Sequence, residues 1–401
     1  MIYRGDHLIT GDGKTVMDGA ALYVDENGRI GQVGPEDEVL ADHPKEPVTD
    51  CGSATILPGL MDMHTHFGYY YSQPDAGEYD DFMLAYHALN EARKAFRRGI
   101  TTIRDVSSPS GLLKQLRRAG EKGYVQVPRI IHTDAGICMT GGHGHDDGVV
   151  EADGADGIRR EIRRQRKNGA DWIKILTSNR EPIPEYTQEE LNAAADECRR
   201  RGIKSAIHAG LQPSIQMAID VGFTSIEHGT FLTVPQARQM AEKGIYWTPT
   251  ITAYTVLWEF CRDAAKNGAD PSDRIAMKAL RDMAFFEPAC SAYRDNFKAL
   301  FDTGVTVIAG TDMVLQGAPA YPINRELALM VEYGITPLQA IQTATENPAR
   351  MLGLLDTTGS LREGLEADVL IVRGDAARDI HALDHVETVL LGGKPVNLEA
   401  F

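Results

Sequence analysis

Residues 57–68, LPGLMDMHTHFG, contain the pattern that decides the fold, because an apolar run ends there in His64 and His66. On a β-strand, alternate side chains project from the same face, so both imidazoles can point at one metal ion. Histidine suits zinc and similar borderline cations. A surface strand with two incidental histidines would show the same spacing, so the rest of the chain has to decide between these interpretations.

Downstream of this segment, apolar runs alternate with charge-rich helical segments. The runs are TTIRDV (101–106), PRIIHT (128–133), WIKILTS (172–178), SAIHAG (205–210), TSIEHG (224–229), YWTPTI (246–251) and VTVIAGTD (305–312). Apolar spacing of three and four residues predicts helices over 84–98, 157–168 and 188–201, the last with a capping box from Thr187 and Glu190. About eight such units fit, which favours an α/β fold with a closed (β/α)8 TIM barrel over an open doubly wound sheet.

The two ends of the chain have a different texture, with period-two alternation broken by Gly, Asp and Asn turns. We expect both ends to share one sheet in a small β-sandwich domain. The predicted boundaries are 1–57 for the N-terminal part of the β-sandwich, 58–352 for the metal-dependent hydrolase barrel, and 353–401 for the C-terminal part of the β-sandwich. The polar segment 264–274 is expected to be an exposed loop.

Composition and charge exclude several classes. The five cysteines are odd in number and lack CxxC spacing, which indicates neither a disulfide framework nor a zinc ribbon. A net charge of -16 repels nucleic acid and anionic membranes, so neither is an expected partner. The first twenty residues have no apolar run of the kind found in signal peptides, and no stretch of about 18 uncharged apolar residues occurs. We therefore expect a cytoplasmic protein.

Four of the later apolar runs contain, at or near their ends, another residue that can bind a metal. These residues are Lys174, His208, His228 and Asp312. Taken singly, a histidine at a strand end is more often part of the core, and an aspartate more often a helix cap. A barrel keeps its active site at the carboxyl ends of its strands, where all of these residues would meet His64 and His66. The sequence therefore predicts one metal cluster made of six residues.

Lys174 is the unusual member of this cluster, because a protonated ammonium cannot bind a cation. A buried lysine with a lowered pKa can act as a base, form a salt bridge, or react with carbon dioxide to give a carbamate whose oxygens bridge two metals. The spacing of residues does not choose among these roles.

The ordered set His64-Thr65-His66, Lys174, His208, His228 and Asp312 closely resembles the amidohydrolase superfamily, and the likeness covers nearly the whole chain. The motifs TGGHGHDDG (140–148) and NGADWIKILTS (168–178) look most like its binuclear Xaa-Pro dipeptidase, or prolidase-like, branch. This resemblance implies two divalent metal ions, with zinc the expected metal and Lys174 carboxylated between them. His64, His66 and Asp312 would hold the first ion, and His208 and His228 the second. Such barrels are commonly homo-oligomers.

The loop at 140–148 adds a further candidate. His143 or His145 can donate to the developing oxyanion or to a substrate carboxylate, and the resemblance favours His143. Alternatively, His143, His145, Asp146 and Asp147 form another metal site, or the loop only packs near the mouth. Arg180 can pair with a substrate carboxylate, but a solvent-facing arginine is favoured. The aromatic stretch after His66 either covers the substrate as a lid or packs under an ordinary loop.

The expected function is hydrolysis of an amide bond, in a peptide or an N-acyl amino acid, by a metal-activated hydroxide with Asp312 as acid and base. The partner is then a small-molecule substrate such as a dipeptide. Deamination is disfavoured because AGLQPS follows His208 without an acidic residue. Lactonase or esterase action, or opening of a cyclic amide as in imidazolonepropionase-like enzymes, remains the alternative, and a non-catalytic barrel is the third possibility.

Overall fold

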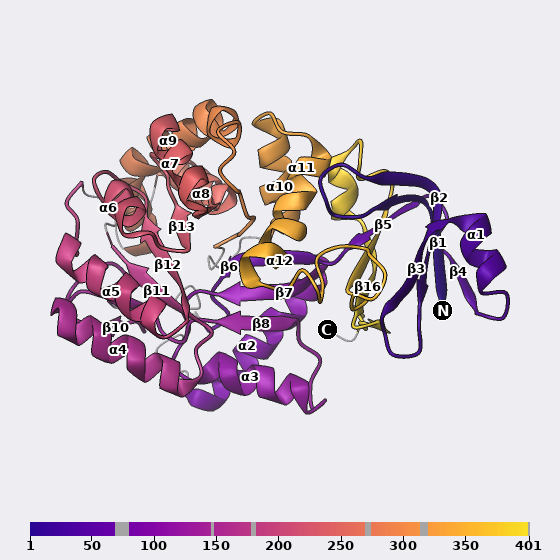
Figure 1. Ribbon diagram of the computed structural model, residues 1–401. Helices are drawn as coiled ribbons and strands as arrows, with labels where there is room; N and C mark the ends of the chain where they lie inside the picture. Colours follow the sequence, from indigo (N-terminus) through magenta and orange to yellow (C-terminus); the bar gives the residue numbers. More distant parts are fainter. Residues whose placement is uncertain (69–79, 146–147, 178–181, 269–273, 313–319, 400–401) are drawn as a thin grey trace.

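The computed structural model describes residues 1–68, 80–145, 148–177, 182–268, 274–312 and 320–399. Strands from the two ends of the chain form one eight-stranded sheet, on the right of Figure 1. Its order is β17-β16-β15-β5-β1-β2-β3, with β4 paired to β1. The prediction that both ends share one sheet is therefore confirmed. The bounds are β1 Ile2–Ile9, β2 Val16–Val24, β3 Ile30–Pro35, β4 Val48–Asp50, β5 Ala54–Pro58, β15 Val369–Arg373, β16 Val386–Leu391 and β17 Lys394–Pro395.

This terminal sheet has its own apolar core. Strand β5 is buried along its whole length, because it lies between β1, to which it is parallel, and β15, to which it is antiparallel. Leu8, Ile56 and Ile371 are at most 1% exposed and belong to one cluster. These side chains hold the two ends of the chain together across more than 300 residues of sequence.

The middle of the chain contains two further sheets in which every pair of strands is parallel. One sheet is ordered β6-β7-β8 and the other β10-β9-β11-β12-β13-β14. Strands of this kind are covered on both faces, which explains their nearly continuous apolar runs. The bounds are β6 Leu60–Thr65, β7 Ile100–Asp105, β8 Arg129–His132, β9 Ile137–Cys138, β10 Val150–Glu151, β11 Trp172–Leu176, β12 Lys204–Ala209, β13 Ser225–His228 and β14 Tyr246–Thr248.

Main-chain hydrogen bonds also connect the edges of these two parallel sheets. The amide of Asp171, just before β11, donates to the carbonyl of His132 at the end of β8 over 2.9 Å. At the other edge, Trp247 of β14 forms a parallel bridge with Val307, and the amide of Met63 in β6 donates to the carbonyl of Ala309 over 3.0 Å. The carboxyl ends of β6, β11, β12 and β13 therefore lie on one side of the molecule.

Helices alternate with these strands and cover them (Figure 1). Their bounds are α1 Glu36–Asp42, α2 Asp81–Phe96, α3 Leu112–Glu121, α4 Gly154–Asn168, α5 Gln188–Arg200, α6 Ser214–Val221, α7 Val234–Lys243, α8 Ile251–Asn267, α9 Arg274–Phe301, α10 Ile323–Glu332, α11 Pro337–Thr343 and α12 Glu346–Leu352, with a short 3-10 helix, η2, at Ile380–Asp384. The predicted capping box of Thr187 and Glu190 is present. Helix α2 begins three residues earlier than predicted because the Asp80 side chain accepts from the amides of Phe82 and Met83.

The expectation of an exposed loop over 264–274 was wrong at its two ends. Helix α8 continues to Asn267 and α9 begins at Arg274, while 269–273 lie outside the described residues. The two alanines and the lysine at 264–266 have high helix propensity, and this outweighs the polar character of the segment. In the part of the chain that the structure describes, no helix combines the length and the apolar character needed to cross a membrane.

Candidate metal centre

The predicted ligands converge at the carboxyl ends of the parallel strands. His64 lies in β6, Lys174 in β11, His208 in β12, and His228 is the last residue of β13. The imidazole rings of these three histidines and of His66 form a continuous row. The distances between ring centroids are 5.2 Å from His66 to His64, 5.0 Å from His64 to His228 and 4.5 Å from His228 to His208. Residues that are up to 164 positions apart in sequence therefore form one cluster, as the strand-end pattern predicted.

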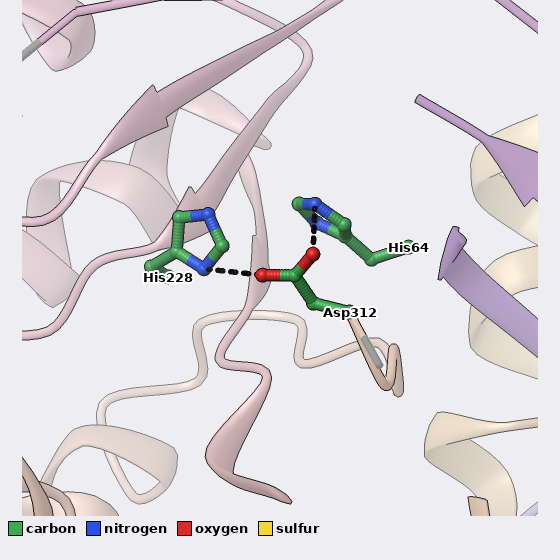
Figure 2. A group of neighbouring side chains, drawn as sticks. All are labelled: His64, His228 and Asp312. Atoms are coloured by element: carbon green, nitrogen blue, oxygen red, sulfur yellow. Dashed lines mark ion pairs between the residues drawn. The ribbon is translucent and has the colours of Figure 1, made fainter. Parts of the chain in front are cut away.

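Asp312 lies at the centre of this cluster, with its two carboxylate oxygens directed at different histidines (Figure 2). Its Oδ1 atom is 3.1 Å from Nε2 of His66 and 3.5 Å from Nε2 of His64, and its Oδ2 atom is 3.9 Å from Nδ1 of His228. One donor atom from each of His64, His228 and Asp312 lies within 4.8 Å of the other two. Two imidazole nitrogens and a carboxylate oxygen at this separation fit a divalent ion such as zinc.

Burial sets the charge of these groups. Loss of solvent lowers the pKa of His64 and of His228 well below the ordinary value, which keeps both imidazoles neutral. Burial opposes the charge of Asp312 as well, but the neighbouring imidazoles and Lys174 outweigh it and lower the pKa of this carboxyl. Neutral imidazoles beside an ionised carboxylate are the protonation states that metal binding requires.

Lys174 is almost fully buried in β11, within electrostatic reach of Glu227 and Asp312. Burial lowers its pKa to about 8, although these two carboxylates act in the opposite direction. About a tenth of this amine is then neutral at pH 7, far more than for a lysine of ordinary pKa. The neutral amine is the form that acts as a base or reacts with carbon dioxide.

The histidine rings are oriented by hydrogen bonds behind them. Nδ1 of His66 donates to the carbonyl of Ser107 over 2.9 Å, and Nδ1 of His64 lies 2.9 Å from Oε2 of Glu227. In the neutral His64 ring the lone pair is then on Nε2, the nitrogen that faces Asp312. At His66 burial lowers the pKa, but the hydrogen bond and the charge of Asp312 outweigh burial and raise it. Nδ1 of His228 lies 2.7 Å from Oγ1 of Thr250.

The main chain is strained at this cluster. His228, Thr250 and Asp312 have φ angles of 67°, 53° and 48°, in the left-handed region that side chains other than glycine rarely adopt. Each such residue costs about 1–3 kcal/mol unless its surroundings enforce it. Two contacts hold Asp312 in this conformation. Its amide donates to the carbonyl of His64 over 2.8 Å, and the buried Asp62 accepts hydrogen bonds from the preceding Thr311.

Three residues that support the site were not among the sequence predictions. These residues are Asp62, Arg104 and Glu227, and all three are fully buried. Arg104 forms an ion pair with Glu227, which in turn contacts Nδ1 of His64. Their signal in the sequence is a charged residue within the apolar runs LMDM, TTIRDV and TSIEHG. Charged side chains are almost never fully buried unless they are paired, so such positions in predicted core strands indicate a buried ion pair or hydrogen-bond network.

The loop after β9 brings His143, but not His145, to the row of histidines. The His143 ring lies 4.2 Å from that of His208, and its amide donates to Oε2 of Glu185 over 2.9 Å. His145 is exposed, with Nδ1 2.9 Å from the carbonyl of Gly142. Asp146 and Asp147 of the alternative metal site lie outside the described residues, as do Arg180 and most of the aromatic stretch after His66.

The chain is similar over nearly its whole length to proteins of one family. The sequence profile of the amidohydrolase family matches residues 55–396. Ochratoxinase from Aspergillus niger is 30% identical over 98% of this chain and 86% of its own length. Imidazolonepropionase from Geobacillus kaustophilus is 25% identical over 95% of this chain and 91% of its own. Among solved structures, a Xaa-Pro dipeptidase with bound methionine in its active site superposes with a TM-score of 0.85 and 29% identity, covering 99% of each chain.

Proposed function

The chain belongs to the amidohydrolase family, a family of hydrolases, and from this premise we propose that it cleaves the amide bond of a dipeptide or an N-acyl amino acid. The observation that carries the proposal is the position of Asp312, between the Nε2 atoms of His64 and His66 on one side and His228 on the other. A carboxylate in this position can hold a cation and also exchange a proton with a water beside it.

The residues divide into two ligand groups that would hold two divalent ions, with zinc the preferred metal. His64, His66 and Asp312 form the first group, and His208 and His228 the second. A carbamate on Lys174 would supply the shared ligand, and the low pKa of this buried amine supports that assignment. When bound, such ions lower the pKa of water towards about 7 and polarise a carbonyl oxygen.

The side chains of the protein then move protons and stabilise charge. Asp312 accepts the proton of the attacking water and passes it to the nitrogen of the leaving amine, for which its ionised state is suited. The His143 ring lies 4.2 Å from that of His208, and His143 donates a hydrogen bond to the developing oxyanion or to the substrate carboxylate.

This function depends on an architecture that we also propose, in which the parallel strands close into an eight-stranded barrel. The hydrogen bonds from Asp171 to His132 and from Met63 to Ala309 support closure, since they join the sheet edges on both sides. The proposed divisions of the chain are 1–57, 58–352 and 353–401. The first division falls at the last residue of strand β5, Pro58, and places β6 in the second part, with the terminal strands in a small β-sandwich.

A substrate screen tests the proposal. Purified protein supplied with zinc or manganese is incubated with L-Xaa-L-Pro and other dipeptides and with N-acyl amino acids, and the released amines are measured with ninhydrin. We expect turnover of at least one class and a loss of 10²-fold or more in Asp312→Asn, which lacks the proton acceptor. Equal activity of Asp312→Asn and the unchanged protein would contradict the proposed role of Asp312.

Hydrolysis of a lactone or ester, or of a cyclic amide, is the second candidate. The likeness to an imidazolonepropionase over 95% of the chain favours a cyclic amide within this class. The same assay distinguishes the two candidates. Turnover of lactones or cyclic amides by metal-loaded protein, without release of amines from linear amides, would replace the first proposal with the second.

A further inference from the structure

A buried ion pair lies directly behind His64. Nη2 of Arg104 donates to both carboxylate oxygens of Glu227, over 2.8 and 2.9 Å. Oε2 of Glu227 is also 2.9 Å from Nδ1 of His64. Arg104 and Glu227 are 0% exposed and His64 is 1% exposed. The three side chains therefore form one continuous hydrogen-bonded chain that is closed to solvent.

Arg104 is itself held from several directions. Its Nε atom donates to the carbonyl of Met63 over 2.7 Å, one residue before His64, and its Nη1 atom donates to Oγ of Ser225 over 2.9 Å. The guanidinium also lies 4.8 Å from the centre of the Trp172 ring. A side chain from β7 thus connects β6, which carries His64, to β13, which carries Glu227.

An ion pair in this place is a weak means of stabilising the fold. Removing both charges from water costs several kcal/mol for each ion, and apolar residues of the same size would often serve as well or better. A carboxylate behind a metal-binding histidine has a different use, since it fixes the tautomer and the direction of the ring. Because Glu227 accepts from Nδ1–H, the lone pair of His64 lies on Nε2, which faces Asp312 at 3.5 Å.

We propose that Glu227 is a positioning residue for metal binding, which holds the Nε2 atom of His64 towards the ion, and that Arg104 holds Glu227 in place. The inference rests on the proposed function in one respect, which is that His64 binds a metal. It adds two residues to the site that touch neither the ion nor the substrate. It also gives the buried charges of TTIRDV and TSIEHG a common role.

The test is the zinc affinity of Glu227→Gln, measured on metal-free protein by competition with a chromophoric chelator. Glutamine keeps an oxygen that can accept from Nδ1–H but loses the carboxylate charge that holds His64 and Arg104, and mutation of an outer partner of this kind lowers metal affinity by about 10- to 100-fold. We expect a loss in that range for the site containing His64, a changed visible spectrum of the cobalt-substituted protein, and partial recovery in Glu227→Asp. Zinc affinity and the cobalt spectrum depend on the ligand geometry and not on turnover.

Glu197 offers a matched control. It is 1% exposed and accepts two hydrogen bonds of 2.8 Å from Arg163, but it lies on the outer helix α5. Glu197→Gln is therefore expected to lower stability while leaving the zinc affinity and the cobalt spectrum unchanged. An equal loss of zinc affinity in Glu197→Gln and Glu227→Gln would mean that loss of any buried glutamate has this effect, and would overturn the proposal.

The single variant Glu227→Gln leaves the Arg104 charge buried without its partner, which can prevent folding. The double variant Arg104→Met/Glu227→Gln removes both charges and is measured beside it, with circular dichroism to verify folding. A folded double variant that binds zinc as tightly as the unchanged protein would overturn the positioning role of Glu227 and Arg104 but leave the proposed function intact. Absence of zinc binding by the unchanged protein would overturn both this proposal and the proposed function.

Discussion

Asp62→Ala is the substitution whose effect follows most directly from the geometry. The buried carboxylate of Asp62 accepts three hydrogen bonds, from the amide of Thr311 over 3.0 Å, the hydroxyl of Thr311 over 2.6 Å and the amide of His64 over 3.2 Å. It thereby joins the residue before Asp312 to His64, a candidate metal ligand. Alanine removes the acceptor for two buried main-chain amides at once.

The expected magnitude follows from these two amides. A buried N–H group left without an acceptor costs about 1–3 kcal/mol, so Asp62→Ala should lower the free energy of unfolding by about 2–6 kcal/mol. The Asp62→Ala variant should also lose turnover. Without the hydrogen bonds between Asp62 and Thr311, the left-handed backbone of the next residue, Asp312, with φ of 48°, is less firmly held. Urea unfolding in the presence of a chelator measures the stability without a contribution from bound metal.

Asp62→Asn is the matched control. Both amides are bound by the same oxygen, Oδ1, which asparagine retains, and its amide group can donate to the Thr311 hydroxyl in place of Oδ2. Burial raises the pKa of Asp62 to about 7, so a neutral side chain is well tolerated here. We expect Asp62→Asn to be much closer to the unchanged protein than Asp62→Ala. Equal free energies of unfolding for Asp62→Ala and the unchanged protein would refute this reasoning.

Three further predictions concern single side chains. Lys174→Ala should lose the second metal and most activity, and short carboxylic acids should restore part of both. Metal analysis and rate measurements test this. Full activity without added acid would exclude the carbamate. His143→Ala should lower kcat by about 10²–10³-fold in the amide assay, as loss of an oxyanion donor does, while the exposed His145→Ala serves as the control and should be unchanged. Burial raises the pKa of Glu326 from 4.5 to about 7. Between pH 4.5 and 7 the folded protein keeps a proton on Glu326 that the unfolded chain has released. The free energy of unfolding, relative to that of Glu326→Gln, should therefore fall with rising pH by up to about 3 kcal/mol. A pH-independent difference between the two proteins in urea unfolding would contradict this.

The positions of the candidate metal-binding residues were predictable from sequence because apolar runs mark where buried strands end. His64 and His66 share a strand face through their spacing, His228 ends the run TSIEH, and Asp312 ends the run VTVIAGTD. Asp312 at the centre of the cluster also agrees with this reasoning.

The supporting network was not predictable in the same way. Arg104 and Glu227 are 123 residues apart, and only the register of several strands brings them together behind His64. The left-handed conformation of Thr250 has no signal in the sequence, because nothing about threonine favours it. The extent of α8 and α9 into the polar segment 264–274 depends on helix propensity and packing, which the hydrophobic pattern does not report.

Metal content per chain is the measurement that tests the central claim most directly. Freshly purified protein is analysed by inductively coupled plasma mass spectrometry, before and after incubation with zinc and bicarbonate, with Asp312→Asn and Lys174→Ala in parallel. We expect close to two equivalents of zinc or a similar divalent metal in the unchanged protein, and fewer in Lys174→Ala. One equivalent or none in protein incubated with zinc and bicarbonate would contradict the binuclear site.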